Sequence, residues 1–323
     1  MDQIALAAAD SVEITMLMDN RIDGLLPPEE QVRRKPWVTG VSNPIIDSPD
    51  VRVSLMAEHG FSALITLTVA GERHSLLFDA GLSPNGLIDN MDRLQVEAKD
   101  IEAVVLSHGH FDHTGGLAGL VDRLGVANRP LLAHPRSYTR RRSAPPNVDP
   151  LPLPPPSRSA LEGAGFEVID TVEPALLFRG SLLVTGEIPR VTEFEQGFPF
   201  FQAFEDGRWE PEPHLADDQG IVVNVQDRGI VVLTGCGHAG IVNIVRGAQA
   251  LTGQERVLAV IGGFHLSGAF FTPLIPLVVD AIREIAPEMI VPAHCTGFRA
   301  EQALAAAFPE AYVQNSVGTT YSF

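Results

Sequence analysis

Four short apolar runs in the sequence each lead into a turn that carries a histidine. Apolar, β-branched runs of this length that stop at glycine or a polar residue are typical of buried strands. The runs and their turns are 101–106 with His108, 230–234 with His238, 257–261 with His265, and 289–291 with His294. Because these strand ends carry the same type of side chain, we expect the chain to fold so that they face one cleft.

The remaining patterns indicate sheets covered by helices. Further strands are predicted at 12–18, 62–69, 75–78 and 221–225, and helices at 84–94, 239–252 and 274–285. The first half begins with strands and then alternates strands and helices, and the second half repeats this order. We therefore predict an α/β (α+β) fold with two sheets between helices, an αββα sandwich. A doubly wound parallel sheet is the alternative, but the short connection 226–229 predicts an antiparallel hairpin.

Residues 1–323 are expected to form a single domain with one insertion. The insertion, at about 140–157, holds a basic triplet and then seven prolines. Proline fixes φ and lacks an N–H donor, so this segment is expected to lie outside the core. It is interpreted as a solvated polyproline loop, or alternatively as a lid or partner-binding arm.

The composition excludes several classes of function. A formal charge of −17 repels phosphate backbones and anionic lipids, so neither a nucleic acid nor a membrane is expected as a partner. Only two cysteines occur, and no apolar run reaches the roughly 18 residues of a membrane span, so a cytoplasmic protein is expected. No G-x-x-x-x-G-K or G-x-S-x-G motif is found, which argues against a phosphate-binding loop and a serine hydrolase. The oligomeric state is not indicated.

The densest group of ligand-type residues is the stretch HGHFDH at 108–113. His108 and His110 are two positions apart at a predicted strand end, so their side chains point to the same side. Asp112 and His113 follow on the turn into the next helix. Imidazole and carboxylate groups bind zinc, manganese and iron. The stretch therefore predicts a metal site, with zinc as the first expectation.

The other histidines are interpreted by their positions. Asp79, in FDAG, follows a strand as the four histidines do, and is a further candidate for binding metal or facing substrate. His134 precedes the proline-rich segment, and whether it lines the site is left open. Structural or surface roles are expected for the remaining three, His59, His74 and His214.

Together these segments resemble the metallo-β-lactamase superfamily. SHGHFDHTGGL is similar to its H-x-H-x-D-H signature. FDAG, TGEIPR, LTGCGHAGIVN, GGFHL and PAHCTG narrow the resemblance to the branch named for 7,8-dihydropterin-6-yl-methyl-4-(β-D-ribofuranosyl)aminobenzene-5′-phosphate synthase. The match runs from about residue 12 to the C-terminus, without the proline-rich segment. The resemblance implies an αββα sandwich with a metal site at one edge between the sheets.

The resemblance also implies a set of ligands for two ions. His108 and His110 match ligands of the first ion, Asp112 and His113 match ligands of the second, and His294 matches the terminal histidine. Two motifs of the superfamily are absent. The region of its T-P-G-H-T motif reads VTGEIPR here, and its bridging aspartate gives way to a cysteine in TGCGH.

These departures leave three residues with open roles. His238 is the candidate for the missing third histidine. Cys236 is either a thiolate ligand or a small residue packed under the site. His265 is a metal ligand, a substrate-facing acid or a structural residue.

The predicted function is hydrolysis by a metal-activated water. Two divalent ions, zinc before manganese or iron, lower the pKa of a bound water to about 7 and stabilise developing charge on a carbonyl or phosphoryl oxygen. Asp112 is the predicted catalytic residue, which ligates the second ion and holds the proton of the water. The expected substrate is a small molecule with an ester, lactone or phosphoester bond. A substrate that carries a phosphate group is among those expected.

Three alternatives stay open. In a condensing enzyme like the named synthase, the ions would bind a pyrophosphate leaving group. Phenylalanines of FPFFQAF would then stack on a pterin, although core packing explains them equally well. A mononuclear iron dioxygenase and a non-catalytic, metal-stabilised binding protein are the others. The sequence fixes neither the metal nor, without the bridging aspartate, the number of ions.

Overall fold

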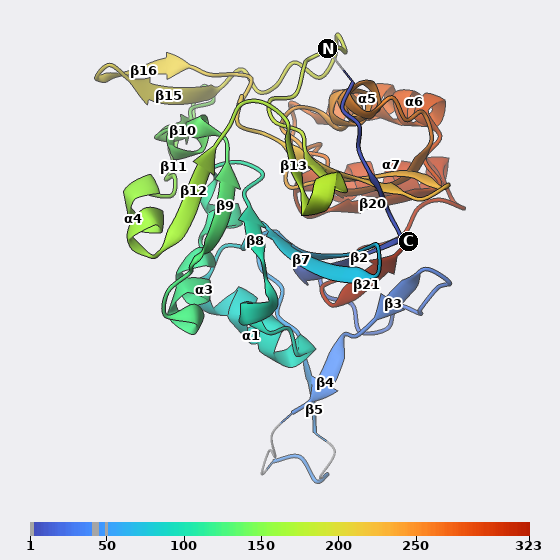
Figure 1. Cartoon of the computed structure of the whole chain (residues 1–323). Coiled ribbons are helices and arrows are strands. Elements are labelled where there is room, and N and C mark those ends of the chain that lie inside the picture. The colour runs from blue at the N-terminus through green and yellow to red at the C-terminus, as the bar shows by residue number, and fades with distance from the viewer. Residues whose placement is uncertain (1–2, 41–44, 49–50) are drawn as a thin grey trace.

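Two β-sheets packed face to face form the centre of the protein, in a computed structural model that describes residues 3–40, 45–48 and 51–323 (Figure 1). Apolar side chains of both sheets fill the space between them, among them Ile14, Phe78 and Val231. Helices cover the outer face of each sheet (Figure 1). The predicted αββα sandwich is confirmed, and the single doubly wound sheet is wrong.

The first sheet has eight strands and includes the strand that leads into HGHFDH. In order across the sheet, the strands are β12 (Phe166–Asp170), β9 (Arg129–Ala133), β8 (Ala103–Val105), β7 (Glu72–Phe78), β6 (Ser62–Val69), β2 (Ser11–Met18), β21 (Thr319–Ser322) and β3 (Val32–Arg34). The four strands β7, β8, β9 and β12 run parallel. Their carboxyl ends therefore meet at one edge.

The second sheet has seven strands and includes the other three histidine-bearing strand ends. Its strands are β13 (Ala175–Leu177), β14 (Leu182–Val184), β17 (Gly220–Val225), β18 (Gly229–Thr234), β19 (Val257–Gly263) and β20 (Met289–Ala293), with β1 (Ala8–Ala9) paired to β17. β17 and β18 form the predicted antiparallel hairpin. β18, β19 and β20 run parallel, so their carboxyl ends also share one edge.

Each sheet buries its outer face under a separate set of helices. α1 (Pro84–Leu94), α3 (Leu117–Leu124) and α4 (Arg158–Gly163) cover the eight-stranded sheet. The seven-stranded sheet is covered by α5 (Ile241–Thr252), α6 (Ile275–Ile285) and α7 (Phe298–Ala307). The helices predicted at 84–94, 239–252 and 274–285 are thus confirmed as α1, α5 and α6.

Short helical turns complete the described chain. They are α2 (Phe111–Thr114) and the 3₁₀ turns η1 (Ala98–Asp100), η2 (Pro135–Tyr138), η3 (Phe178–Gly180), η4 (Thr272–Leu274) and η5 (His294–Thr296). No helix among the described residues combines the length and the apolar character needed to cross a membrane. Of these turns, α2 begins directly after the predicted ligand His110, and η5 begins at the predicted ligand His294.

The proline-rich segment is more ordered than predicted. It contributes β10 (Arg141–Ser143) and β11 (Leu151–Leu153) to a four-stranded sheet with β15 (Phe201–Glu205) and β16 (Arg208–Pro211). Pro152 is accommodated because β11 is the edge strand, where a missing N–H leaves no partner unsatisfied. A solvated polyproline loop is therefore wrong for this part of the segment. A separate hairpin, β4 (Trp37–Thr39) with β5 (Arg52–Ser54), extends away from the sandwich (Figure 1).

Candidate metal centre

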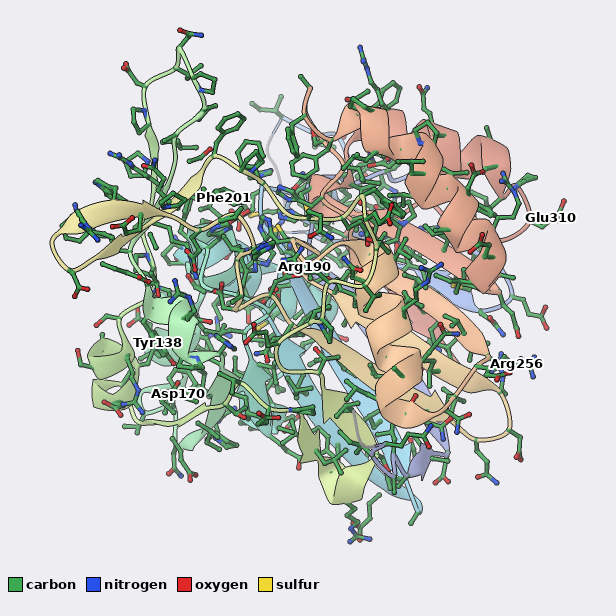
Figure 2. The ribbon with its side chains drawn as sticks, turned by 90° about the horizontal axis from the view of Figure 1, so that it is seen from above. Tyr138, Asp170, Arg190, Phe201, Arg256 and Glu310 are labelled. Atoms are coloured by element: carbon green, nitrogen blue, oxygen red, sulfur yellow. The ribbon has the colours of Figure 1, made fainter. Side chains whose placement is uncertain are left out.

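The carboxyl ends of strands from both sheets converge on one cluster of side chains. β8 is followed by His108, His110 and α2, and β18 is followed by Cys236 and His238. The turn after β18 is also held by Arg190, which is labelled near the middle of the molecule in Figure 2 and donates a hydrogen bond to the carbonyl of His238 at 2.9 Å. The predicted convergence of strand ends is therefore present.

Three histidines form the first group of ligand-type atoms. A ring nitrogen from each of His108, His110 and His238 lies within 4.8 Å of the other two. All three Nε2 atoms are buried, and none has a hydrogen-bond partner among the described residues. An unpaired buried polar atom costs free energy of about 1–3 kcal/mol, and three together need a shared partner. A cation bound by the three nitrogens would supply it.

The ionisation of this group suits a metal. Burial lowers the pKa of His110 to about 4, and burial together with His113 lowers the pKa of His108 well below its ordinary value. Burial and His265 lower the pKa of His238 in the same direction. The three rings are therefore neutral at pH 7 and present lone pairs, as metal-binding imidazoles must.

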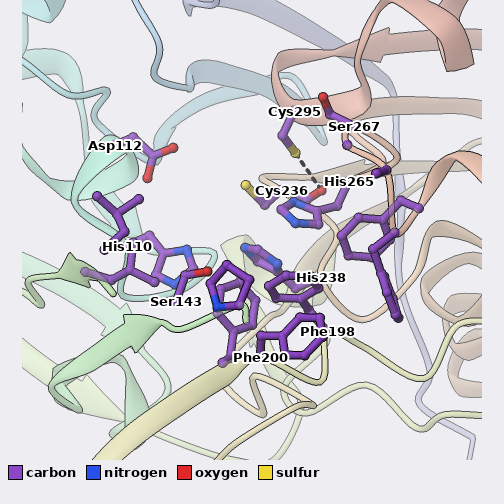
Figure 3. A pocket seen from close by; sticks show the side chains of 18 of the residues that line it. His110, Asp112, Ser143, Phe198, Phe200, Cys236, His238, His265, Ser267 and Cys295 are labelled. Atoms are coloured by element: carbon purple, nitrogen blue, oxygen red, sulfur yellow. Dashed lines mark hydrogen bonds between the residues drawn. The ribbon is translucent and has the colours of Figure 1, made fainter. Parts of the chain in front are cut away.

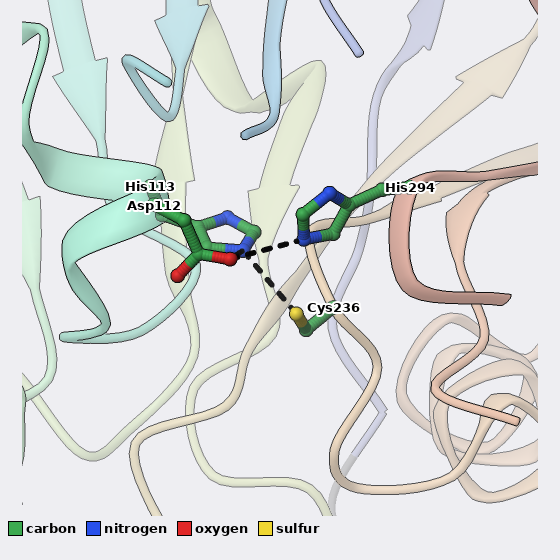
Figure 4. Close-up of side chains that lie close together, drawn as sticks. All are labelled: Asp112, His113, Cys236 and His294. Atoms are coloured by element: carbon green, nitrogen blue, oxygen red, sulfur yellow. Dashed lines mark hydrogen bonds and ion pairs between the residues drawn. The ribbon is translucent and has the colours of Figure 1, made fainter. Parts of the chain in front are cut away.

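A second group lies beside the first and contains Asp112, His113, Cys236 and His294 (Figure 4). Nε2 of His113 is 3.2 Å from Sγ of Cys236, and Nε2 of His294 is 3.3 Å from Oδ2 of Asp112. Both of these imidazoles therefore point at atoms that are themselves ligands of divalent ions. A set of nitrogen, oxygen and sulfur ligands such as this one fits zinc and also fits iron.

Cys236 lies between the two groups. It belongs to the second group, and its Sγ also lies within 4.8 Å of ring nitrogens of His238 and His265. Cys236 therefore belongs to the second group and to a third, and the third group shares His238 with the first. Cys295 is nearby and donates a hydrogen bond from Sγ to the carbonyl of Cys236 at 3.1 Å.

Hydrogen bonds behind the two groups fix the orientation of their rings. The hydroxyl of Ser107 donates to Asp79 Oδ2 at 2.7 Å, and its Oγ lies 2.9 Å from Nδ1 of His108. Because the hydroxyl hydrogen is used on Asp79, Nδ1–H of His108 must donate to Ser107, which leaves Nε2 of His108 with its lone pair facing the centre.

Asp79 is placed as a support for His113. Its Oδ2 accepts a hydrogen bond from Nδ1–H of His113 at 2.7 Å, and its Oδ1 accepts one from the amide of Ser107 at 2.7 Å. Burial would lower the pKa of His113, but the carboxylates of Asp79 and Asp112 raise it to about 9. Asp79 is fully buried and is not among the residues that line the cavity described below.

His294 is held by residues that the sequence reasoning missed. Asn20 donates from its amide to the carbonyl of His294 at 2.9 Å, and its Oδ1 lies 3.1 Å from Nδ1 of the same ring. Asp19 accepts the amide hydrogen of His294 at 2.8 Å. The available signal was a polar pair directly after the strand at 12–18, the same position that the histidines occupy after theirs.

A second buried support holds the HGH turn. Asp217 accepts a hydrogen bond from the amide of Gly109 at 2.8 Å and forms an ion pair with Arg141 at 2.9 Å. Arg141 also pairs with Glu212 at 2.7 Å. A Cβ at Gly109 would stand 1.9 Å from the carbonyl oxygen of Ser137, so the turn requires glycine here. The proline-rich segment thus carries a fully buried arginine, which the sequence reasoning had placed in solvent.

A cavity of about 660 Å³ opens onto both groups (Figure 3). His110, Asp112, Cys236 and His238 form its inner end. Its outer part is lined mainly by phenylalanines, together with prolines and leucines of the proline-rich segment. A cavity of this size is typical of a small-molecule site.

His59 lines the cavity, although the sequence reasoning gave it a structural or surface role. Its side chain is 65% exposed, yet Nε2 lies 3.6 Å from Oδ2 of Asp112, and the centroid of its ring is 5.0 Å from that of His294. The loop before β6 brings it there, because the amide of Phe61 donates to the carbonyl of Asp112 at 3.1 Å. The polar context of His59 in the sequence contains no signal for this.

The remaining histidines differ in their positions relative to the cavity. His265 lines the cavity with its ring 4.0 Å from that of His238, and its φ of 45° is in the left-handed region, which is uncommon for a non-glycine residue. His134 is buried outside the cavity, where its Nδ1 accepts the amide hydrogen of Arg136. As expected, neither His74 nor His214 contributes to the cavity.

Comparisons with known proteins agree with this geometry. The sequence model of the Metallo-beta-lactamase superfamily matches residues 58–240. A 7,8-dihydropterin-6-methyl-4-(beta-D-ribofuranosyl)-aminobenzene-5′-phosphate synthase of Methanocaldococcus jannaschii is 29% identical over 274 residues, which cover 83% of this chain and 90% of that protein. An uncharacterized protein of the same organism is 32% identical over 247 residues, which cover 76% of this chain and 86% of its own.

One solved structure shares the fold along nearly its whole length. Tm1679, described as a metal-dependent hydrolase of the beta-lactamase superfamily, superimposes with a TM-score of 0.71 over 96% of this chain and 98% of its own. Its sequence is 22% identical, so the likeness concerns the fold.

Proposed function

The chain belongs to the metallo-β-lactamase superfamily, and from that premise we propose that it is a dinuclear metal-dependent hydrolase of small esters, lactones or phosphoesters. One observation carries the proposal. Two groups of buried ligand-type atoms, one of three histidines and one that includes Cys236, stand at the inner end of a cavity large enough for a small molecule.

The proposal assigns the ligands by group. His108, His110 and His238 would hold one divalent ion, and Asp112, His113 and His294 would hold the other, with Cys236 between them. Bound there, the ions would lower the pKa of a water to about 7 and polarise the carbonyl or phosphoryl oxygen of the substrate. His265 stays a candidate for binding metal or facing substrate from the cavity wall.

Asp112 is the proposed catalytic residue. Burial would raise the pKa of its carboxyl, but His113 and His294 outweigh burial and hold that pKa well below its usual range. The carboxylate is therefore ionised at neutral pH and, as a weak base, would accept a hydrogen bond from an attacking water and orient it rather than hold its proton. The side chain of His59, which is 65% exposed, has its Nε2 3.6 Å from this carboxylate.

Metal content and turnover test the proposal together. We expect about two divalent ions per purified chain, zinc before manganese or iron, measured by elemental analysis. His108→Ala and His294→Ala should each lose metal and turnover in a screen of esters, lactones and phosphoesters. His214→Ala, which changes an exposed histidine away from the cavity, is the matched control. Full turnover in either centre variant would contradict the proposal, as would iron alone with oxygen uptake.

A second candidate function rests on the relative from Methanocaldococcus jannaschii, which is named as a synthase. Phe198, Phe200 and Phe201 of the FPFFQAF stretch do line the cavity and offer faces for a flat ring. Phe204 does not; it packs against Trp209 at 5.2 Å on β15 and β16. Saturable binding of a pterin phosphate, with release of pyrophosphate in a condensation, would favour this candidate over hydrolysis.

A further inference from the structure

The outer part of the cavity is an aromatic wall built from two separate segments of the chain. Phe198 is at its centre, with ring centroids 5.2 Å from Phe200 and 5.0 Å from Phe201. From the loop after β19, Phe270 and Phe271 pack against the same ring at 5.4 and 5.6 Å. Three of these four pairs meet edge to face and the fourth is stacked, and all five rings line the cavity.

The proline-rich segment adds apolar side chains to this space. Leu151 and Leu153 of β11 line the cavity, as do Pro145 and Pro146 in the connection from β10. Leu151 is 59% exposed, although it belongs to an apolar surface. Leu153 packs in one cluster with Phe201 and Phe198, so aliphatic and aromatic side chains form one apolar surface, which is suited to bind a flat apolar group.

This part of the cavity offers no cation to an anionic group. None of the described residues that line it is lysine or arginine. Arg141 belongs to the same hairpin, but it is buried and engaged by Glu212 and Asp217. A phosphate placed among the phenylalanines would lose its hydration without gaining a charged partner, which is strongly unfavourable.

We infer that the substrate is an uncharged ester or lactone that carries an aromatic, or similarly flat apolar, group. The inference rests on the proposed hydrolysis and names its substrate class. The ring would lie against Phe198, Phe270 and Leu151 of β11, and the ester carbonyl would reach Asp112 and His238 at the inner end. Hydrolysis breaks the bond between the acyl carbon and the ester oxygen; the acyl carbon gains the hydroxyl of water, and the ester oxygen gains its proton.

Binding of 2-naphthol to the metal-loaded protein tests the wall without any turnover. We expect saturable binding by calorimetry, and we expect Phe198→Ala and Phe270→Ala each to weaken it about three- to tenfold. Phe298→Ala is the matched control, since this ring is 66% exposed and lies outside the cavity. 6-Hydroxynaphthalene-2-sulfonate, which adds a charge to the same rings, should bind at least tenfold more weakly. Absence of saturable 2-naphthol binding, an equal loss in the control, or tighter binding of the sulfonate would overturn the inference.

A pair of substrates separates this inference from the proposed function. 2-Naphthyl acetate should have a higher kcat/KM than 2-naphthyl phosphate, and a preference for the phosphate would overturn the substrate class. If 2-naphthol binds as expected but no ester is hydrolysed, the aromatic site stands and the proposed hydrolysis is wrong. If ethyl acetate is hydrolysed as well as the naphthyl ester and 2-naphthol does not bind, hydrolysis stands and the inference is wrong.

Discussion

Asp79→Asn is expected to weaken metal binding while it keeps the packing of the centre. The carboxylate of Asp79 accepts three hydrogen bonds of 2.7 Å, from the amide and hydroxyl of Ser107 and from Nδ1 of His113. An amide of the same size has one acceptor oxygen, so at least one of these donors would face an N–H group. This mismatch is expected to cost about 1–3 kcal/mol of stability.

The effect on the metal follows from the same geometry. The negative charge of Asp79 makes Nε2 of His113 a stronger donor to a cation, and loss of such a partner typically lowers metal affinity about 10- to 100-fold. That range corresponds to about 1.4–2.7 kcal/mol of binding free energy. Zinc affinity is to be measured by competition with a chromophoric chelator, and the stability of the metal-free protein by urea denaturation.

The chain contains a matched control for this substitution. Glu102 likewise contacts a histidine and a serine amide, at 3.0 Å from Nδ1 of His74 and 3.1 Å from the amide of Ser75, but it lies at the surface away from the centre. Glu102→Gln should leave zinc affinity unchanged. The reasoning fails if Asp79→Asn binds zinc within twofold of the parent protein, or if Glu102→Gln loses as much affinity.

Two further predictions concern the sulfur between the ligand groups and a buried acid. Cys236→Ser should reduce the metal content from about two ions to about one per chain, whereas Cys295→Ser in the same cavity should keep both; two ions in both variants would identify Cys236 as a packing residue. Glu195 caps α5 by accepting the amide hydrogens of Val242 and Asn243, and burial raises the pKa of its carboxyl to about 7 from an ordinary 4.5. The folded state therefore holds a proton that the unfolded chain has released, so this contribution to stability is lost as the pH rises through 7. The free energy of unfolding of Glu195→Gln relative to the parent should rise by about 2 kcal/mol between pH 5 and pH 8; a difference that does not vary with pH in urea denaturation would contradict this.

Most of the fold is predictable because its elements follow from local patterns. α1 begins at Pro84, directly after Ser83, whose hydroxyl accepts the amide hydrogen of Gly86, and both are typical helix-start residues. The β17–β18 hairpin follows from two apolar runs with a short polar connection. β10 and β11 were missed because their sheet depends on the pairing of β10 with β15, about 60 residues further along the chain. A proline-rich pattern does not reveal that such a partner is available.

The site is predictable to the extent that each ligand follows a recognisable strand. His108, His110 and His294 could be proposed from their strand ends and from the superfamily signature. His59 could not, because a loop with no pattern of its own carries it to the side of Asp112. Arg141 was misplaced for a related reason: its burial is stable only because Glu212 and Asp217, distant in sequence, neutralise it.

The geometry also explains why no single segment defines the centre. The first group takes two of its histidines from the eight-stranded sheet and His238 from the other sheet. The second takes Asp112 and His113 from the eight-stranded sheet, and Cys236 and His294 from the other. Both groups therefore assemble only where the two sheets meet. The buried imidazole nitrogens at that edge have no hydrogen-bond partner, which lowers the free energy of unfolding of the metal-free protein. Because the same nitrogens are proposed to hold the ions, metal binding should also stabilise the packed sandwich.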